Sequence, residues 1–177
     1  YHDEIDGTPQ FCRVYLPSDY DSEKQWPLIA WLHGYSPENP EYINFSIASK
    51  RHDPIADSYH VIFIEPHGRG NTSYLGMGDR DVLRGIELAK ANFNVDEDRV
   101  YLTGESMGGG GTWHVGSRHP EIFAALAPVY GGWDHHVWMD RGRQNEMTDK
   151  EHFVHDINDS SVQLESLLNT SVLVLHG

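Results

Sequence analysis

The sequence contains little cysteine and no long hydrophobic run. Cys12 is the only cysteine among 177 residues, which excludes an internal disulfide and a zinc site built from several cysteines. The longest apolar runs, such as residues 61–64, are far shorter than the roughly 20 apolar residues that cross a bilayer. The sequence therefore predicts a soluble protein without a membrane partner, and it leaves the compartment open, cytoplasmic or secreted.

Positive charge is also scarce. Lysine and arginine total 13 against 27 aspartates and glutamates, for a formal net charge of −14 at pH 7. A surface this acidic repels phosphate backbones and anionic lipid headgroups. We therefore expect no nucleic-acid partner and no anionic membrane, whereas the composition does not bear on the oligomeric state.

Short apolar runs alternate along the chain with helix-like stretches. The runs expected to form strands are residues 11–16, 28–32, 61–65, 100–103, 124–129 and 171–175. The stretches expected to form helices are residues 43–57 (interrupted by Pro54), 79–92, 108–119 and 163–168. The apolar runs show no in–out alternation, which is typical of strands covered by helices on both faces. The predicted fold class is α/β, with a mostly parallel, doubly wound sheet.

The length fits a single domain over residues 1–177, and one segment departs from the alternation. Residues 131–158 are polar and yet include Trp133 and Trp138. Long connections in compact domains are usually lids or binding loops, and tryptophans are costly to leave in water. We interpret the segment as a lid or insertion, with a solvated surface excursion as the alternative.

The candidate nucleophile is Ser106, at the centre of a G-x-S-x-G pattern between a predicted strand and a predicted helix. A serine on so sharp a turn has a strained backbone, at a cost of about 1–3 kcal/mol. Side chains two residues before and after it would collide with neighbouring backbone, and Gly104 and Gly108 avoid this collision. The turn would expose the hydroxyl at a helix N-terminus, which favours the negative charge that develops during attack.

A run of glycines, residues 108–111, continues from this turn into the predicted helix. Each glycine in a helix costs about 0.8–1 kcal/mol relative to alanine. Their number indicates that another part of the backbone approaches closely there. The alternative is a flexible glycine loop.

An oxyanion hole needs a second backbone N–H group from an earlier loop. His33, Gly34 and Tyr35 follow the second predicted strand directly. We expect the N–H groups of Met107 and Tyr35 to hold the oxyanion, with Gly34 allowing the loop to come close. His33 is interpreted as a support for the turn rather than a catalytic base.

These motifs resemble the α/β-hydrolase superfamily, whose oxyanion loop and nucleophile elbow are similar to residues 32–34 and 104–109. Residues 96–104 and 120–125 resemble a narrower group within it. That group contains the serine esterases and peptidase-like hydrolases related to prolyl oligopeptidase, dienelactone hydrolase and feruloyl or polyhydroxybutyrate esterases. The resemblance covers about residues 10–177.

In the superfamily the catalytic acid and then the histidine follow the nucleophile along the chain. The resemblance implies that both follow the last predicted strand and lie beyond Gly177, so that the C-terminal part of the fold is missing from this sequence. A competing assignment uses residues that are present, although their order contradicts the superfamily's. Its candidate acids are Asp134, Asp140 and Asp156, and its candidate bases are His135, His136, His152 and His155.

Two further patterns carry weaker signals. His152, His155 and Asp156 have a spacing that could suit a metal, but 12 histidines in the chain make such pairs common by chance, and we expect no metal site. Gly68-Arg69-Gly70-Asn71 lacks the phosphate-loop pattern. Arg69 either contacts a substrate carboxylate or, as we favour, pairs with one of the many surface acids.

The sequence therefore predicts a serine hydrolase that cleaves a small-molecule carboxylic ester through an acyl-enzyme on Ser106, with no cofactor. One alternative is a serine peptidase of the prolyl-oligopeptidase type. Another is a noncatalytic binding module that retains the elbow. The tryptophans at 113, 133 and 138 are compatible with a pocket for aryl or sugar-linked esters, and equally with core packing.

Overall fold

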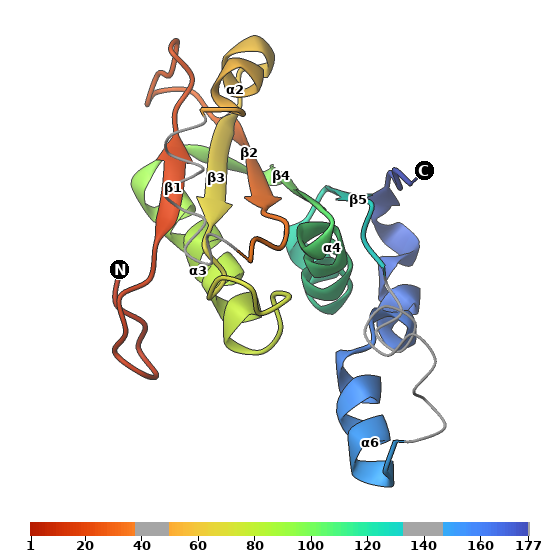
Figure 1. Cartoon of the computed structure of the whole chain (residues 1–177). Coiled ribbons are helices and arrows are strands. Elements are labelled where there is room, and N and C mark those ends of the chain that lie inside the picture. The colour runs from red at the N-terminus through yellow and green to blue at the C-terminus, as the bar shows by residue number, and fades with distance from the viewer. Residues whose placement is uncertain (38–49, 133–146, 177) are drawn as a thin grey trace.

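The computed structural model describes residues 1–37, 50–132 and 147–176 and contains a six-stranded sheet (Figure 1). The strands are β1 (Cys12–Tyr15), β2 (Trp26–Leu32), β3 (Ile62–Pro66), β4 (Val95–Glu105), β5 (Ala125–Val129) and β6 (Ser171–Val172). Their order across the sheet is β1-β3-β2-β4-β5-β6. The β1 strand runs antiparallel to β3 and the other neighbours are parallel, as the predicted mostly parallel sheet requires.

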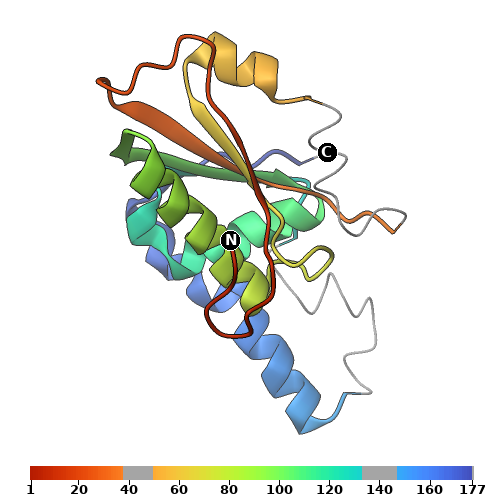
Figure 2. The same ribbon diagram turned by 90° about the vertical axis from the view of Figure 1, so that its left-hand side faces the viewer.

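Helices cover both faces of the sheet, which confirms the predicted fold class. The α3 (Met77–Asn92) and α4 (Met107–Arg118) helices lie on one face, and α2 (Asp53–Tyr59) lies on the other (Figure 2). The larger core lies on the α3–α4 face, and the smaller one joins Ala56 of α2 to Val61 and Phe63. The remaining helical elements are η1 (Pro120–Ile122), α6 (Asp149–Asn158) and η3 (Ser160–Asn169).

Burial alternates along the inner strands, contrary to the sequence-based expectation. In β2, Leu28, Ala30 and Leu32 are fully buried on the α3–α4 face, whereas Ile29 and Trp31 are only partly buried on the opposite face. The sequence hides this alternation because both faces carry apolar side chains. All five residues of β3 are buried, as its continuous apolar run predicts.

The prediction that Pro54 interrupts a helix over residues 43–57 is wrong. The α2 helix begins at Asp53, and Pro54 lies in its first turn, where the missing N–H would have had no partner within the helix. Pro54 therefore starts the helix instead of interrupting it. The helix continues to Tyr59 and ends with His60 in the left-handed conformation, at φ 53°. Residues 43–49 of the prediction lie outside the described residues.

Part of the polar segment 131–158 is helical. The α6 helix was not predicted, although Thr148 and Glu151 form a capping box at its start. The η3 helix, also longer than predicted, follows α6 directly. Residues 133–146 lie outside the described residues, so the interpretation as a lid stays a prediction. Within the described ranges, no helix is long and apolar enough to cross a membrane.

A partly buried carboxylate lies where α3 and α4 pack together. Asp79 is in the first turn of α3, and its Oδ2 lies 3.5 Å from Nε2 of His119 and 4.0 Å from Nε2 of His114. Burial raises the pKa of Asp79, and nearby His119 and Arg118 oppose this effect only partly. The folded protein therefore holds this proton more tightly than the unfolded chain does.

We expect Asp79→Asn to be more stable than the wild type at pH 7. A raised pKa means that the carboxyl favours folding fully below the ordinary value of 3.8, and that this contribution is lost as the pH rises through the higher folded value. The advantage of the variant should therefore shrink as the pH falls toward 3.5. Urea unfolding of both proteins at several pH values measures it. Exposed Asp98→Asn is the control, with an expected change within about 0.5 kcal/mol, and an advantage independent of pH would contradict the explanation.

Candidate active site

The two motifs meet at one edge of the sheet because their strands are neighbours. The β2 and β4 strands are parallel, and Leu32 pairs with Gly104. The loop formed by residues 33–36 and the turn at Ser106 therefore leave the sheet side by side, at the carboxyl ends of the strands. Ligand sites of open α/β sheets lie at this edge.

The β4 strand leads directly into α4 (Figure 1). Ser106, the residue between them, has a strained conformation and is exposed to solvent. Its φ is 56° and its ψ −115°, a region that side chains disfavour. Gly76, the residue before α3, has nearly the same angles, φ 56° and ψ −107°. The chain thus uses glycine for this geometry at one helix start and serine at the other, which indicates that the hydroxyl at position 106 has a use.

The backbone around Ser106 is held from both sides. Its N–H donates to the carbonyl of Val129 at 2.9 Å, and its own carbonyl accepts the N–H of Gly110 at 3.0 Å. The second bond is the first i to i+4 bond of α4, so the N–H of Met107 has no partner within the helix. This N–H lies at the positive end of the helix, directly after the serine.

The glycines flanking Ser106 are required by close backbone contacts. A Cβ atom at Gly104 would lie 2.5 Å from the Leu32 carbonyl oxygen and 2.6 Å from that of Gly108. At Gly108 it would lie 2.0 Å from the Leu32 oxygen. The elbow is therefore pressed against the end of β2, and a methyl group does not fit.

The glycine run has a similar cause further along α4. A Cβ at Gly109 would lie 2.4 Å from the Val129 oxygen, and one at Gly111 would lie 2.4 Å from the ring of Tyr74. Gly110 is different, because its nearest neighbour would be the Gly132 oxygen at 3.4 Å. The predicted close approach is confirmed. The alternative of a flexible glycine loop is wrong, because all four residues are helical.

The loop of residues 33–36 approaches the elbow at Gly34. A Cβ there would lie 3.4 Å from the Glu105 oxygen and 3.6 Å from the Cβ of Ser106. The side chain of Tyr35 is 63% exposed, so it does not anchor the loop by packing. The N–H group of Tyr35 is thus carried by a backbone that passes beside the serine.

His33 is buried, and its two ring nitrogens lie 2.9 Å from the carbonyl oxygens of Gly34 and His67. Burial lowers the pKa of His33, although the contacts with both carbonyls oppose this effect. Both nitrogens are therefore engaged with backbone, an arrangement that suits a support of the loop better than a proton-accepting base.

The structure does not bring the α6 candidates to Ser106. Arg118, at the far end of α4, donates to the carbonyl of Ile157 in α6 at 2.6 Å. The 12-residue α4 helix is about 18 Å long, and α6 extends away from the sheet in both views (Figures 1 and 2). The candidates on α6 are His152, His155 and Asp156. The other candidates of that assignment, Asp134, Asp140, His135 and His136, lie outside the described residues.

Arg69 pairs with acidic residues, as favoured from the sequence. Its guanidinium lies 2.8 Å from Asp81, 2.7 Å from Asp6 and 3.3 Å from Asp3. Asp3 and Asp81 are buried, so this is an internal network rather than a surface pair. Over the described ranges, no group of three or more histidine, cysteine, aspartate or glutamate side chains could hold a metal ion.

One contact beside the nucleophile was missed by sequence reasoning. Glu105 is paired with Arg51, with Nη1 and Oε1 3.1 Å apart. The same guanidinium lies 6.0 Å from the centre of the Trp31 ring. No sequence signal indicates a pair 54 residues apart, because it depends on where α2 begins relative to β4.

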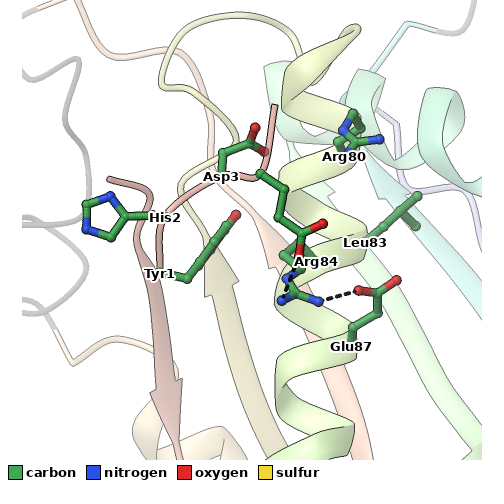
Figure 3. A pocket seen from close by; sticks show the side chains of 8 residues that line it. Tyr1, His2, Asp3, Arg80, Leu83, Arg84 and Glu87 are labelled. Carbon is green, nitrogen blue, oxygen red and sulfur yellow. Dashed lines mark hydrogen bonds and ion pairs between the residues drawn. The ribbon is translucent and has the colours of Figure 1, made fainter. Parts of the chain in front are cut away.

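A separate cavity of about 230 Å³ lies between the N-terminal residues and α3 (Figure 3). Arg84 is one of its lining residues and lies 3.0 Å from Glu87 and 3.6 Å from Glu4. None of the candidate site residues lines this cavity. It is therefore distinct from the site at Ser106.

The strain at Ser106 can be measured. Ser106→Gly and Ser106→Ala both lose the hydroxyl, but only the alanine keeps a Cβ at positive φ, so we expect the glycine variant to be more stable by about 1 kcal/mol. Gly76→Ala is the reverse control, because a Cβ there meets nothing within 4 Å. Its free energy of unfolding should fall by about as much as that of Ser106→Gly exceeds that of Ser106→Ala. Equal urea midpoints for the two Ser106 variants would show that the turn is unstrained.

The chain is similar in sequence to proteins named as hydrolases. A bifunctional acetylxylan esterase/xylanase, XynS20E, of Neocallimastix patriciarum is 33% identical over 129 residues, which are 71% of this chain and 18% of that protein. Dipeptidyl-peptidase 5 of Porphyromonas gingivalis is 28% identical over 131 residues, 68% of this chain and 19% of that protein. The chain thus spans about one fifth of the length of these relatives.

Among solved structures, the fluorophosphonate-binding serine hydrolase FphF of Staphylococcus aureus has a TM-score of 0.71 at 21% identity, with 98% of this chain and 75% of that chain covered. This likeness shows an α/β-hydrolase fold. The profile of the prolyl oligopeptidase family matches residues 60–177, more than half of the sequence. The chain therefore belongs to the prolyl oligopeptidase family within the α/β-hydrolase superfamily, whose members include esterases and peptidases.

Proposed function

We propose that this chain carries the nucleophile of a serine hydrolase that cleaves carboxylic esters. The observation that carries the proposal is an exposed serine held at φ 56° on the N-terminus of α4, beside the loop of residues 33–36. An accessible hydroxyl at the positive end of a helix suits attack on an acyl carbon, because the negative charge then develops where the helix favours it. The likeness to an acetylxylan esterase supports an ester as substrate.

The reaction proceeds in two steps. The oxygen of Ser106 bonds to the acyl carbon, its proton passes to a base, and collapse of the tetrahedral intermediate expels the alcohol, which takes up that proton. Water then attacks the acyl-enzyme and releases the acid. The N–H groups of Met107 and Tyr35 hold the oxyanion in both steps, and Gly34 gives the second donor room to approach.

The general base and its acid lie outside the described residues in this proposal. A serine without a base is a poor nucleophile at neutral pH, because its hydroxyl stays protonated. Both ring nitrogens of His33 lie against backbone carbonyl groups. The histidines of α6 lie on a helix that contacts the far end of α4 through the hydrogen bond from Arg118 to Ile157. The described residues, 1–37, 50–132 and 147–176, are therefore proposed to supply nucleophile, oxyanion donors and scaffold.

A second candidate is a serine peptidase with the same machinery. It is favoured by the likeness to dipeptidyl-peptidase 5 and by the family to which the chain belongs. Peptidases must protonate a poorer leaving group, an amine, so the two candidates differ in the ratio of amide to ester turnover. A panel of ester and amide substrates distinguishes them.

The test is carried out on the full-length protein. A fluorophosphonate probe should label Ser106, and a panel of p-nitrophenyl esters should be hydrolysed with higher kcat/KM than dipeptide p-nitroanilides. Higher turnover of the anilides would make the protein a peptidase. A folded protein that takes no label at Ser106 and hydrolyses neither class would instead be a noncatalytic binding module.

A further inference from the structure

The loop that carries Tyr35 is held by a second loop, residues 67–74, which follows β3. Asn71, in this second loop, makes two hydrogen bonds through its side-chain amide to the backbone of Ser36, in the loop that carries Tyr35. Nδ2 donates to the Ser36 carbonyl at 2.8 Å, and the Ser36 N–H donates to Oδ1 at 3.1 Å. A side chain that satisfies both groups of one residue fixes its position and its orientation.

Two more contacts join the same loops. Nε2 of His33 lies 2.9 Å from the carbonyl oxygen of His67, and the hydroxyl of Tyr74 donates to the carbonyl of His33 at 3.2 Å. Tyr74 is completely buried, and its ring lies where a Cβ on Gly68 or Gly111 would be. The glycine run of α4 therefore accommodates the tyrosine that supports the loop.

The second loop is itself strained. Arg69, Ser73 and Tyr74 have φ values of 63°, 58° and 58°. Non-glycine residues keep such angles only where the surrounding contacts determine them, and clusters of them occur at functional sites. The strain indicates that the placement of this loop relative to residues 33–36 matters to the protein.

We propose that Asn71 is a positioning residue of this site, whose amide holds the loop of residues 33–36 so that the N–H of Tyr35 points at the oxyanion. The inference rests on the proposed function. Tyr35 does not anchor itself, because its side chain is exposed, and the residue that follows it is held by the amide. The hydrogen bonds at His33 and Ser36 thus hold the backbone on both sides of the Tyr35 N–H group.

Asn71→Ala should lower kcat for an ester about 10- to 100-fold and leave KM within about threefold. A misplaced oxyanion donor loses an interaction that is made mainly in the transition state, and complete loss of such a donor costs about 10²- to 10³-fold. Asn71→Asp keeps the acceptor for the Ser36 N–H and loses the donor to its carbonyl, so an intermediate kcat is expected. An aryl trifluoromethyl ketone forms a tetrahedral adduct with the serine. Its inhibition constant should rise by about the same factor by which kcat falls.

Asn94→Ala is the matched control. The amide of Asn94 also donates to a backbone carbonyl, that of Ser22 at 3.1 Å. Asn94 directly precedes β4, however, so it lies at the amino ends of the strands, away from Ser106. It should leave kcat and the inhibition constant unchanged. If Asn71→Ala does not fold, Tyr74→Phe keeps the ring, removes the hydrogen bond to His33, and should show the same lowered kcat at nearly constant KM.

The outcomes separate this inference from the proposed function. A wild-type protein that neither hydrolyses esters nor takes the fluorophosphonate label would overturn both. An active wild type whose Asn71→Ala variant is less stable to heat but keeps its kcat within twofold would overturn the inference alone, because Asn71 would then serve only the fold. A rise confined to KM would also overturn it.

Discussion

Ser106→Ala in the full-length protein is expected to abolish ester hydrolysis while leaving the fold intact. Removing the nucleophilic serine of a complete triad lowers kcat by about 10⁴- to 10⁶-fold, because the histidine and acid then have no group to activate. The side chain of Ser106 is exposed, so the substitution removes no buried contact. Initial rates with p-nitrophenyl acetate and labelling with a fluorophosphonate measure the loss.

The control for this variant is Ser58→Ala, which changes an exposed serine of α2. It should hydrolyse and take the label like the wild type. Circular dichroism and the urea midpoint should be the same for Ser106→Ala as for the wild type or slightly better. Retention of more than a few per cent of the wild-type rate by Ser106→Ala would show that another residue is the nucleophile.

Gly108→Ala and Gly110→Ala are expected to change stability in opposite directions, although they lie two residues apart in one helix. The new Cβ of Gly108→Ala would lie 2.0 Å from the Leu32 oxygen and 2.8 Å from the His33 oxygen. Both are backbone atoms at the end of β2, so relief requires moving the strand or the loop. We expect a loss of more than about 4 kcal/mol, or no folding, because overpacking here also displaces backbone.

Gly110→Ala places its Cβ 3.4 Å from one oxygen, that of Gly132, which is an ordinary contact. Alanine is a better helix former than glycine, so the variant should gain up to about 0.8 kcal/mol. Urea unfolding at pH 7 compares the two variants with the wild type. A Gly108→Ala variant that loses less than about 1 kcal/mol would contradict the close packing of the elbow against β2.

The elbow could be predicted because its sequence pattern is local, although the contacts that require Gly104 and Gly108 come from Leu32, more than 70 residues away in the chain. A sharp turn at Ser106 demands glycine two residues before and after it, and the strand and helix around it show their own apolar patterns. The same holds for α3 and for the fully buried β3, whose sequences are periodic or continuously apolar. The sequence patterns that indicate these elements lie within a few residues of the chain.

Other elements were missed although a local signal existed, or because the signal was ambiguous. The capping box of Thr148 and Glu151 predicts the start of a helix, but the residues that follow are so polar that the segment reads as a loop. Pro54 is equally consistent with a helix break and with a helix start. The uneven cover of the sheet was hidden because Ile29 and Trp31 are apolar on the less buried face.

The sequence by itself indicated the α/β class, the serine on a sharp turn and the glycines around it, because each of these has a recognisable pattern within a short stretch of chain. Only the tertiary structure decided what surrounds the serine: the approach of Gly34, the hydrogen bonds from Asn71 to Ser36, and the ring of Tyr74 against Gly111. These contacts join segments about 35 to 72 residues apart. They exist because β3, β2 and β4 lie side by side in the sheet, and strand order is set by packing across the whole domain rather than by any local pattern.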